Sequence, residues 1–417
     1  MTPPPPELTE GAIFEVLLRL PPDDPASLVR SSLVCKPWRG IISDPGFPRR
    51  YREFHRSPPI LGFLRNNINP FAGSGWKGRT CSLAPIAAAN SPPLLDPELH
   101  FPGGWALDSR HGRVLMDREG GESHMLAVWD PVTGGRHVLE KPGGEDDVFQ
   151  HSRHSAAVLC AAAANCDHCD CSGGPFIVVF VASYGRKARA WVYSSEKGAW
   201  SAPAVVGIHD HAFVERKRAV IVVDEIHEIC CFLLSGGALG YRTRFTAVLK
   251  YDLGRHCLSV IDAPEVYEEM VALMSMDAGS LEFAGIRGST LYLWSRKVNP
   301  MEDIGWLQCN VIELKTLFDT HRLNMPLPVY VICFAEGINA IVVGTHYNTL
   351  TLELNSGRVS KSSELMYSAE VFPIMTFYTP EVGYLAAAST EGNTEREGPE
   401  AEVVVPLFPA ASKKEVY

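Results

Sequence analysis

The chain of 417 residues has no apolar run long enough to cross a lipid bilayer. Its most apolar stretches, near residues 155–164 and 219–234, are short or interrupted by charge, whereas a membrane-spanning helix needs about 20 apolar residues. Residues 1–7 lack both a basic start and an apolar segment, so a secretory leader is not expected. We therefore expect the eleven cysteines to be mostly reduced and the protein to reside in the cytoplasm, the nucleus or both.

The chain also lacks the motifs of two common enzyme classes. It has no Gly-x-Ser-x-Gly nucleophile elbow and no glycine-rich phosphate loop followed by Lys-Ser or Lys-Thr. Its main acidic clusters, at residues 145–147 and 265–269, lie in polar, turn-like stretches and are expected to be solvated surface. We assign no catalytic residue.

An excess of positive charge is missing as well. The net charge is −10, and residues 1–56 hold eight Lys/Arg against seven Asp/Glu, a balance of +1, so the remainder carries −11. Binding to phosphate backbones needs a cationic face, which so acidic a segment does not offer. We expect neither nucleic acid nor a membrane as a partner.

The first fifty residues have the pattern of a small helical module. Pro21 and Pro22 end a first helix because proline has no N–H to donate, and Asp24-Pro25 is a good start for the next. So small a module buries only a small core, and its remaining apolar surface is expected to pack on another protein. Three apolar stripes follow at roughly helical spacing: Leu8, Ile13, Leu17 and Leu20; then Leu28, Leu33 and Val34; then Trp38, Ile41 and Ile42.

Pro37 restricts where the third helix can begin. If that helix begins near Ser32 to Val34, Pro37 sits in its first turn and removes no hydrogen bond. An earlier start would place the proline inside the helix and kink it. We predict the first arrangement.

This pattern resembles an F-box over about residues 7–50. The motif runs from the first helix through Leu20-Pro21 to residues 34–39 (Val-Cys-Lys-Pro-Trp-Arg) and a Ser-Asp-Pro-x-Phe exit at residues 43–47. It departs from the family at Pro37, where a basic or polar residue is usual. The resemblance implies binding to the Skp-type adaptor of a cullin-RING ubiquitin ligase. Carried over position by position, the adaptor-binding residues are Leu8, Ile13, Leu17, Leu20, Pro21, Leu28, Leu33, Val34, Cys35, Trp38 and Phe47. Alternatively some of them, Cys35 and Leu17 foremost, only hold the helices together.

After residue 59 the pattern changes to short apolar runs separated by glycine, proline and polar turns, as at residues 126–129, 176–181 and 289–294. Their length and their β-branched or aromatic content favour strands. Glycine and proline total 66 residues (35 and 31), which suits many tight turns. We predict an α+β multidomain chain: an all-α F-box of three helices over residues 7–50, a linker over 51–60, a mostly β, propeller-like domain over 60–385, and a flexible polar tail over 386–417.

A weak repeat within the β region indicates propeller blades. An apolar strand that leads into a polar turn recurs at residues 128–134, 191–198, 249–254, 311–315 and 352–357. The spacings from Val128 to Val192, Leu249, Ile312 and Leu352 are 64, 57, 63 and 40 residues. These periods suit four-stranded blades with insertions, in which each recurring segment is taken as the edge strand. The alternative is a pair of stacked sheets.

This β region is similar to the propeller-type associated domain of plant F-box proteins, particularly those from grasses. The similarity rests on residues 128–131, 250–261, 283–294 and 311–315. It implies a surface that recognises a protein substrate, and no cofactor. Together the two resemblances imply a substrate-recognition subunit of an SCF-type ubiquitin ligase, joined through the Skp-type adaptor to a cullin. The alternatives are an F-box interaction protein acting outside a complete ligase, and an enzyme whose site lies at the propeller axis.

One cluster has the residue types of a metal site. Cys166 and Cys169 have Cys-x-x-Cys spacing, and His168 with Cys171 could complete four ligands, with Cys160 nearby. The adjacent His168 and Cys169 can hardly both face one ion, and no distant second pair is present to close a site. We therefore favour an ordinary loop before a buried strand and predict no metal.

Overall fold

The computed structural model describes most of the two predicted domains. The predicted tail at 386–417 and the last residues of the predicted β domain lie outside the described residues. The described residues are 8–68, 79–85, 100–102, 104–120, 123–143, 153–162, 166, 168, 171, 173–223, 227–236, 244–268, 271–276, 279–297, 305–317, 329–345, 349–362 and 370–379.

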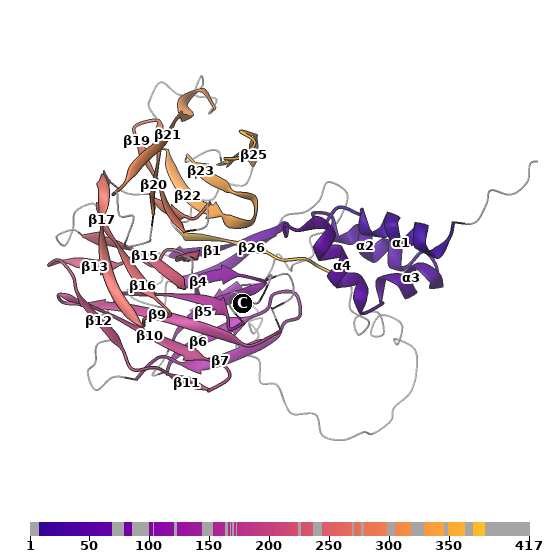
Figure 1. Cartoon of the computed structure of the whole chain (residues 1–417), viewed down its shortest axis with the longest axis horizontal. Helices are drawn as coiled ribbons and strands as arrows, with labels where there is room; N and C mark the ends of the chain where they lie inside the picture. Colours follow the sequence, from indigo (N-terminus) through magenta and orange to yellow (C-terminus); the bar gives the residue numbers. More distant parts are fainter. Residues whose placement is uncertain are drawn as a thin grey trace, which may run out of the picture.

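Four helices form the N-terminal domain: α1 (Glu10–Leu18), α2 (Pro25–Ser32), α3 (Lys36–Ile42) and α4 (Gly46–His55) (Figure 1). The Thr9 hydroxyl caps α1 by accepting the Ala12 N–H at 3.3 Å. Pro25 opens α2, as predicted. Pro37 lies in the first turn of α3, also as predicted, although the helix begins at Lys36 rather than near Ser32 to Val34 because Cys35 is extended.

The helix α4 adds to the three predicted helices and includes the first residues of the predicted linker. It forms because Phe47 and Tyr51, one turn apart, are both fully buried against the other helices. The arginines between them hide this stripe in the sequence. Tyr51 Oη donates to the Leu20 carbonyl at 2.8 Å, and His55 Nε2 donates to the Leu18 carbonyl at 2.9 Å, so α4 holds the end of α1.

The described strands form six antiparallel sheets, the blades of a propeller (Figure 1). The predicted propeller-like domain is confirmed, and the alternative of two stacked sheets is wrong. Blade 1 contains β26 (Glu370–Met375), β1 (Ile60–Ile68), β2 (Arg79–Pro85) and β3 (His100–Pro102); blade 2 contains β4 (Gly104–Arg110), β5 (Arg113–Gly120), β6 (Ser123–Trp129) and β7 (Arg136–Glu140). Blade 3 contains β8 (Arg153–Cys160), β9 (Phe176–Tyr184), β10 (Lys187–Ser194), β11 (Ala199–Trp200) and β12 (Ala204–Gly207).

The remaining three blades are also antiparallel sheets built from consecutive strands. Blade 4 contains β13 (Ala212–Val214), β14 (Val220–Val223), β15 (Glu228–Gly236), β16 (Arg244–Asp252) and β17 (Cys257–Glu268); blade 5 contains β18 (Ala272–Met274), β19 (Ser280–Arg287), β20 (Thr290–Lys297) and β21 (Leu307–Glu313), followed by the 3-10 turn η4 (Leu314–Thr316). Blade 6 contains β22 (Tyr330–Ala335), η6 (Glu336–Ile338), β23 (Ala340–Gly344), β24 (Thr349–Glu353) and β25 (Val359–Ser362).

The recurring apolar segments are mostly third strands, not the edge strands we predicted. Four of them lie in β6, β10, β16 and β24, and a further strand pairs outside each, whereas only β21 is an outermost strand. Outermost strands are polar and exposed, as in β7 and β25, so they carry little hydrophobic signal. Third strands face a neighbouring blade on both sides and are correspondingly apolar.

The ring of blades is closed by strands from opposite ends of the chain. β26 pairs antiparallel with β1, placing Phe372 opposite Leu64 and Glu370 opposite Asn66. Apolar clusters of buried side chains then join every neighbouring pair of blades, including blade 6 to blade 1 through Cys333, Val342 and Phe63. The core of the domain is therefore a set of interfaces between blades.

The helical domain lies to one side of the propeller, where β1 and β26 meet it (Figure 1). Phe377, just after β26, is buried among Leu17, Leu28 and Tyr51 of the helical core. In the described part of the chain, no helix combines the length and apolar character needed to cross a membrane.

Candidate functional site

The predicted adaptor-binding residues divide into buried and exposed groups. Leu17, Leu28 and Phe47 are fully buried in the helical core. Ile13, Leu20 and Trp38 are half-buried and pack against that core. These six side chains therefore hold the helices together, as the alternative interpretation anticipated for Leu17.

Five other predicted residues lie on the surface: Leu8, Pro21, Leu33, Val34 and Cys35. The exposed fractions of Leu8, Leu33 and Val34 are 63%, 67% and 63%. Cys35 is exposed too, so the suggestion that it only holds the helices together is wrong. Residues 33–37 are five consecutive exposed positions, and Lys36 is the one charged residue among them.

The connection between α2 and α3 presents these side chains because its backbone is already satisfied. The Leu33 and Val34 N–H groups donate to the Arg30 and Ser31 carbonyls at 3.1 and 3.2 Å. Cys35 is then extended, and its carbonyl accepts the Arg39 N–H at 3.0 Å. The chain thus turns tightly between two helices with its apolar side chains directed outward.

Sequence reasoning missed two exposed apolar residues of this domain: Phe54 on α4, which is 47% exposed, and Val16 on α1, which is 51% exposed. Val16 precedes Leu17 and does not belong to the buried stripe of Ile13, Leu17 and Leu20. An apolar residue outside the buried stripe of a helix is the feature of the sequence that could have identified it. Within residues 8–55 there are five of the twelve large apolar side chains that are most exposed in the described chain. Neighbouring exposed apolar side chains, such as those of Leu33 and Val34, are typical of a protein–protein contact.

Tyr51 fixes the Leu20-Pro21 turn that follows α1. Burial raises the pKa of Tyr51 well above its ordinary value, and the charges of Asp23 and Asp24 raise it further. The phenol therefore stays protonated and donates to the Leu20 carbonyl. The turn that carries exposed Pro21 is held in place from inside the domain.

The propeller axis is the other place where a site could form, and charged side chains of three blades meet across it. Arg110 of blade 2 contacts Glu336 of blade 6 at 2.6 Å, and Arg218 of blade 4 contacts the same carboxylate at 3.1 Å. Asp108 lies 3.3 to 3.5 Å from both arginines. Burial raises the pKa of Glu336, but the two guanidinium groups outweigh burial and lower this pKa to about 2. Three alternate blades thus meet through ion pairs.

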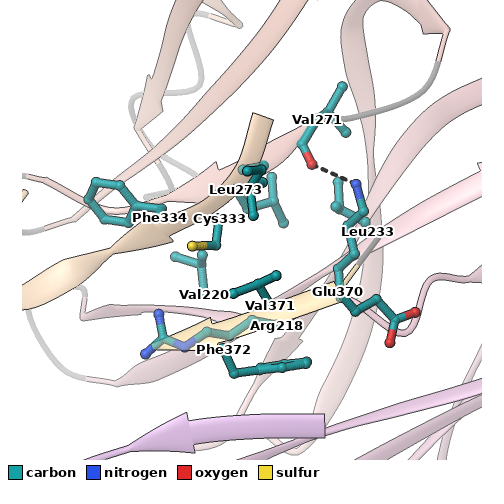
Figure 2. A pocket seen from close by; sticks show the side chains of 13 residues that line it. Arg218, Val220, Leu233, Val271, Leu273, Cys333, Phe334, Glu370, Val371 and Phe372 are labelled. Atoms are coloured by element: carbon teal, nitrogen blue, oxygen red, sulfur yellow. Dashed lines mark hydrogen bonds between the residues drawn. The ribbon is translucent and has the colours of Figure 1, made fainter. Parts of the chain in front are cut away.

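A cavity of about 30 Å³ lies between the inner strands of blades 1, 4, 5 and 6 (Figure 2). Lys217 lines this cavity, and its Nζ donates to the Val271 carbonyl at 2.9 Å, the hydrogen bond drawn as a dashed line in Figure 2. Glu370 lines the cavity, and burial raises its pKa to about 7. The hydrogen bond from Asn66 lowers this pKa but does not offset the effect of burial. Pockets for small-molecule ligands are about 300–1,000 Å³, so this cavity has room for water rather than for a metabolite.

Four side chains with metal-ligand chemistry converge at the end of β8. One potential ligand atom each from Cys160, Cys166, His168 and Cys171 lies within 4.8 Å of every other. We predicted an ordinary loop here, because the adjacent His168 and Cys169 can hardly both face one ion and because no distant second pair is present. Cys169 lies outside the described residues. The structure instead brings in Cys160, the last residue of the strand.

Comparison with known proteins identifies the helical domain. Residues 5–50 match the model of the F-box domain. Because F-box domains bind Skp-type adaptors, the match implies an adaptor-binding role in SCF-type complexes for this domain. Among curated protein sequences, none matches the chain.

Several solved structures resemble the chain at low identity. The Dos1 propeller is 9% identical with a TM-score of 0.33, over 69% of this chain and 66% of that one, just under two thirds of its length. A protein from Lactobacillus plantarum is 13% identical with a TM-score of 0.36, over 75% and 99%. A functionally unknown protein from Desulfotomaculum acetoxidans is 12% identical with a TM-score of 0.35, over 72% and 78%.

Proposed function

We propose that this chain is the substrate-recognition subunit of an SCF-type ubiquitin ligase. The helical domain would dock on a Skp-type adaptor and through it on a cullin, while the propeller binds a protein to be ubiquitinated. The observation that carries the proposal is the exposed apolar run at residues 33–37, with Leu8 and Val16 also exposed, in a domain that matches the F-box.

The energetic argument concerns this exposed surface. Removing a leucine or valine side chain from water stabilises a complex by about 1.5–3 kcal/mol. Leu33 and Val34 are each about two-thirds exposed, so a partner that covers both gains several kcal/mol. The flanking helices fix their backbone beforehand, which lowers the entropic cost of docking.

The mechanism that follows is proximity rather than chemistry in this chain. A target held by the propeller would meet the charged conjugating enzyme at high effective concentration, because both are parts of one assembly. The link between the two domains supports this role. Four residues connect α4 to β1, the first strand of the propeller. After β26, the last strand that the structure describes, Phe377 packs into the helical core.

An enzyme centred on the axis is less well supported by the described residues. The cavity between the inner strands is about 30 Å³, and the charged groups where blades 2, 4 and 6 meet pair with one another: Asp108, Arg110, Arg218 and Glu336. A catalytic acid or base must instead reach a bound substrate.

The test replaces the exposed side chains without touching the core. We expect Leu33→Ser with Val34→Ser to weaken binding of the full chain to a purified Skp-type adaptor at least tenfold, as measured by calorimetry. The matched control is Leu307→Ser with Val311→Ser on β21, whose side chains are 56% and 45% exposed but belong to the propeller. Leu20 and Trp38 are unsuitable because they also pack against the helical core.

Equal adaptor affinity for the two double variants, with unchanged circular dichroism, would overturn the adaptor assignment. The same Leu33/Val34 variant also serves as bait for the target, since it keeps the propeller while failing to recruit the ligase. Proteins enriched on this bait and stabilised when the ligase is inhibited are the expected substrates. Recovery of adaptor without cullin by the unmodified chain would instead indicate an F-box protein acting outside a complete ligase.

A further inference from the structure

The cluster at the end of β8 combines a strand with the loop that follows it. Cys160 ends β8, and a connection of 15 residues leads to Phe176 at the start of β9. Cys166, His168 and Cys171 lie on that connection. Cys160 and Cys171 are buried, while Cys166 and His168 are half-buried. The ligand types therefore gather below the surface, with one side open to solvent.

The spacing of their atoms is close to that of a tetrahedral zinc site. Zinc binds thiolate sulfur at about 2.3 Å and imidazole nitrogen at about 2.0–2.1 Å, so ligand atoms around one ion lie about 3.5–3.8 Å apart. Cys171 Sγ and His168 Nδ1 are 3.8 Å apart, and no pair among the four exceeds 4.8 Å. Movement of side chains by about 1 Å would complete the tetrahedron.

Two N–H donors approach the sulfur atoms of the cluster. Arg113 of blade 2 directs Nη1 at Cys171 Sγ from 3.9 Å, and the His168 backbone N–H donates to Cys166 Sγ at 3.4 Å. Three thiolates around Zn²⁺ carry a net charge of −1, which the Arg113 guanidinium balances. Hydrogen bonds to ligand sulfurs of this kind orient the ligands and tune their basicity.

The same groups fix the loop to the neighbouring blade. Arg113 Nη2 donates to the Cys171 carbonyl and, at 2.7 Å, to the Gly174 carbonyl. The ring of His111, in the turn between β4 and β5, stacks on His168 with centroids 4.0 Å apart and planes 5° from parallel. The orientation of the candidate imidazole ligand is thus set by blade 2.

We propose that Cys160, Cys166, His168 and Cys171 bind one Zn²⁺ ion, a structural site that fastens the β8–β9 loop of blade 3 to blade 2. Binding replaces the proton of each thiol by a zinc–sulfur bond and releases these protons to solvent. All four positions are filled by protein, so the ion has no open position for a substrate. The proposal is independent of the adaptor assignment.

Metal content of the full chain tests the site directly. We expect one equivalent of zinc to remain after dialysis, and cobalt substitution to give the charge-transfer and ligand-field absorption of a tetrahedral thiolate site. Cys166→Ser and His168→Ala should abolish this absorption. The matched controls Cys257→Ser and Cys309→Ser, which remove exposed thiols elsewhere, and Cys169→Ser, next to the cluster, should retain it.

Alkylation of the unmodified protein provides a readout that does not depend on a variant folding. Cys166 is half-exposed and would react readily if free. With zinc bound it should stay unmodified in native protein and become alkylated after a strong chelator is added, as peptide mass spectrometry would show. Zinc-free protein with Cys166 reactive from the start, a disulfide within the cluster, or metal lost with Cys169→Ser but kept with Cys160→Ser would overturn the proposal.

Discussion

The ring of Tyr51 meets the ring of Phe377 edge-on, with centroids 6.2 Å apart and planes at 81°. Tyr51 belongs to α4, whereas Phe377 follows the strand that closes the propeller. An edge-on pair of this kind adds about 0.5–1.5 kcal/mol beyond the area it buries. The core of the helical domain therefore contains a side chain delivered from the opposite end of the described chain, and its stability depends on propeller closure.

Phe377→Ala should destabilise the helical domain by about 3–5 kcal/mol, because it leaves a cavity in a small core. Urea unfolding followed by helical circular dichroism measures the change. The matched control is Phe54→Ala, which removes the same side chain from an exposed position on α4 that is 47% exposed. We expect the control to cost less than about 1 kcal/mol. Equal losses would show that Phe377 is not part of the helical core.

The contact between Tyr51 and Phe377 is an example of what the sequence does not predict, in contrast to the local structure. The helical module, Pro37 in a first turn and the apolar strands follow from local patterns, because burial imposes a period on neighbouring residues. The pairing of β26 with β1 joins residues about 300 positions apart, such as Asn66 and Glu370. The spacing of apolar residues along a short segment carries no information about such a distant partner. Phe377 was invisible in the sequence for the same reason.

Glu336 should give the protein a specific acid sensitivity. Its folded pKa of about 2 is lower than the ordinary glutamate value of about 4.3, so the folded state binds fewer protons than the unfolded state between these values. The stabilisation is fully present above the unfolded pKa and is lost as the pH falls from about 5 towards 2. We expect Glu336→Gln to flatten this part of a plot of unfolding free energy against pH.

At neutral pH the same Glu336→Gln change should cost about 3 kcal/mol, since Arg110 would lose its closest counterion while remaining buried. The matched control is Glu196→Gln, at an exposed position between β10 and β11. We expect its effect to stay within about 0.5 kcal/mol. A Glu336 variant as stable as the control would show that the axial ion pairs do not hold alternate blades together.

Glu370 should act in the opposite direction. Its folded pKa of about 7 exceeds the unfolded value of about 4.3, so the folded state holds an extra proton between them. The contribution of Glu370 to stability is greatest below the unfolded pKa and declines as the pH rises towards 7. Glu370→Gln, which keeps an oxygen for Asn66, should therefore stabilise the protein by about 1–3 kcal/mol at pH 8 and by much less at pH 4.5.

Chemical unfolding at these two pH values measures the difference. The nearby charges of Arg216 and Glu215 act on the same carboxyl with opposite signs, and Lys217 lines the same cavity. A Gln variant that is less stable than the parent at pH 8 would mean that Glu370 is ionised and usefully paired there.

Asp117 of blade 2 is buried between Lys141, which follows β7 of the same blade, and His154 of blade 3, and its removal should be costly. Lys141 Nζ and His154 Nε2 each lie 2.6 Å from its carboxylate, and all three side chains are at least 95% buried. Although burial raises the pKa of Asp117, the contacts with His154 and Lys141 hold that pKa far below its ordinary value. Burial also lowers the pKa of His154, so the neutral ring donates to Asp117.

Asp117→Asn should reduce the unfolding free energy by about 3–5 kcal/mol, because it leaves the Lys141 ammonium buried without a counterion. Adding Lys141→Met removes that ammonium and should recover a large part of the loss, so the two changes are strongly non-additive. The exposed pair of Arg49 and Glu53, at 2.8 Å, is the matched comparison, and Glu53→Gln there should cost less than about 1 kcal/mol. Urea unfolding of the parent, Asp117→Asn, Lys141→Met and the double variant completes the cycle. Additive effects at Asp117 and Lys141 would show that the two charges do not interact, and the loss would then have to come from the His154 hydrogen bond alone.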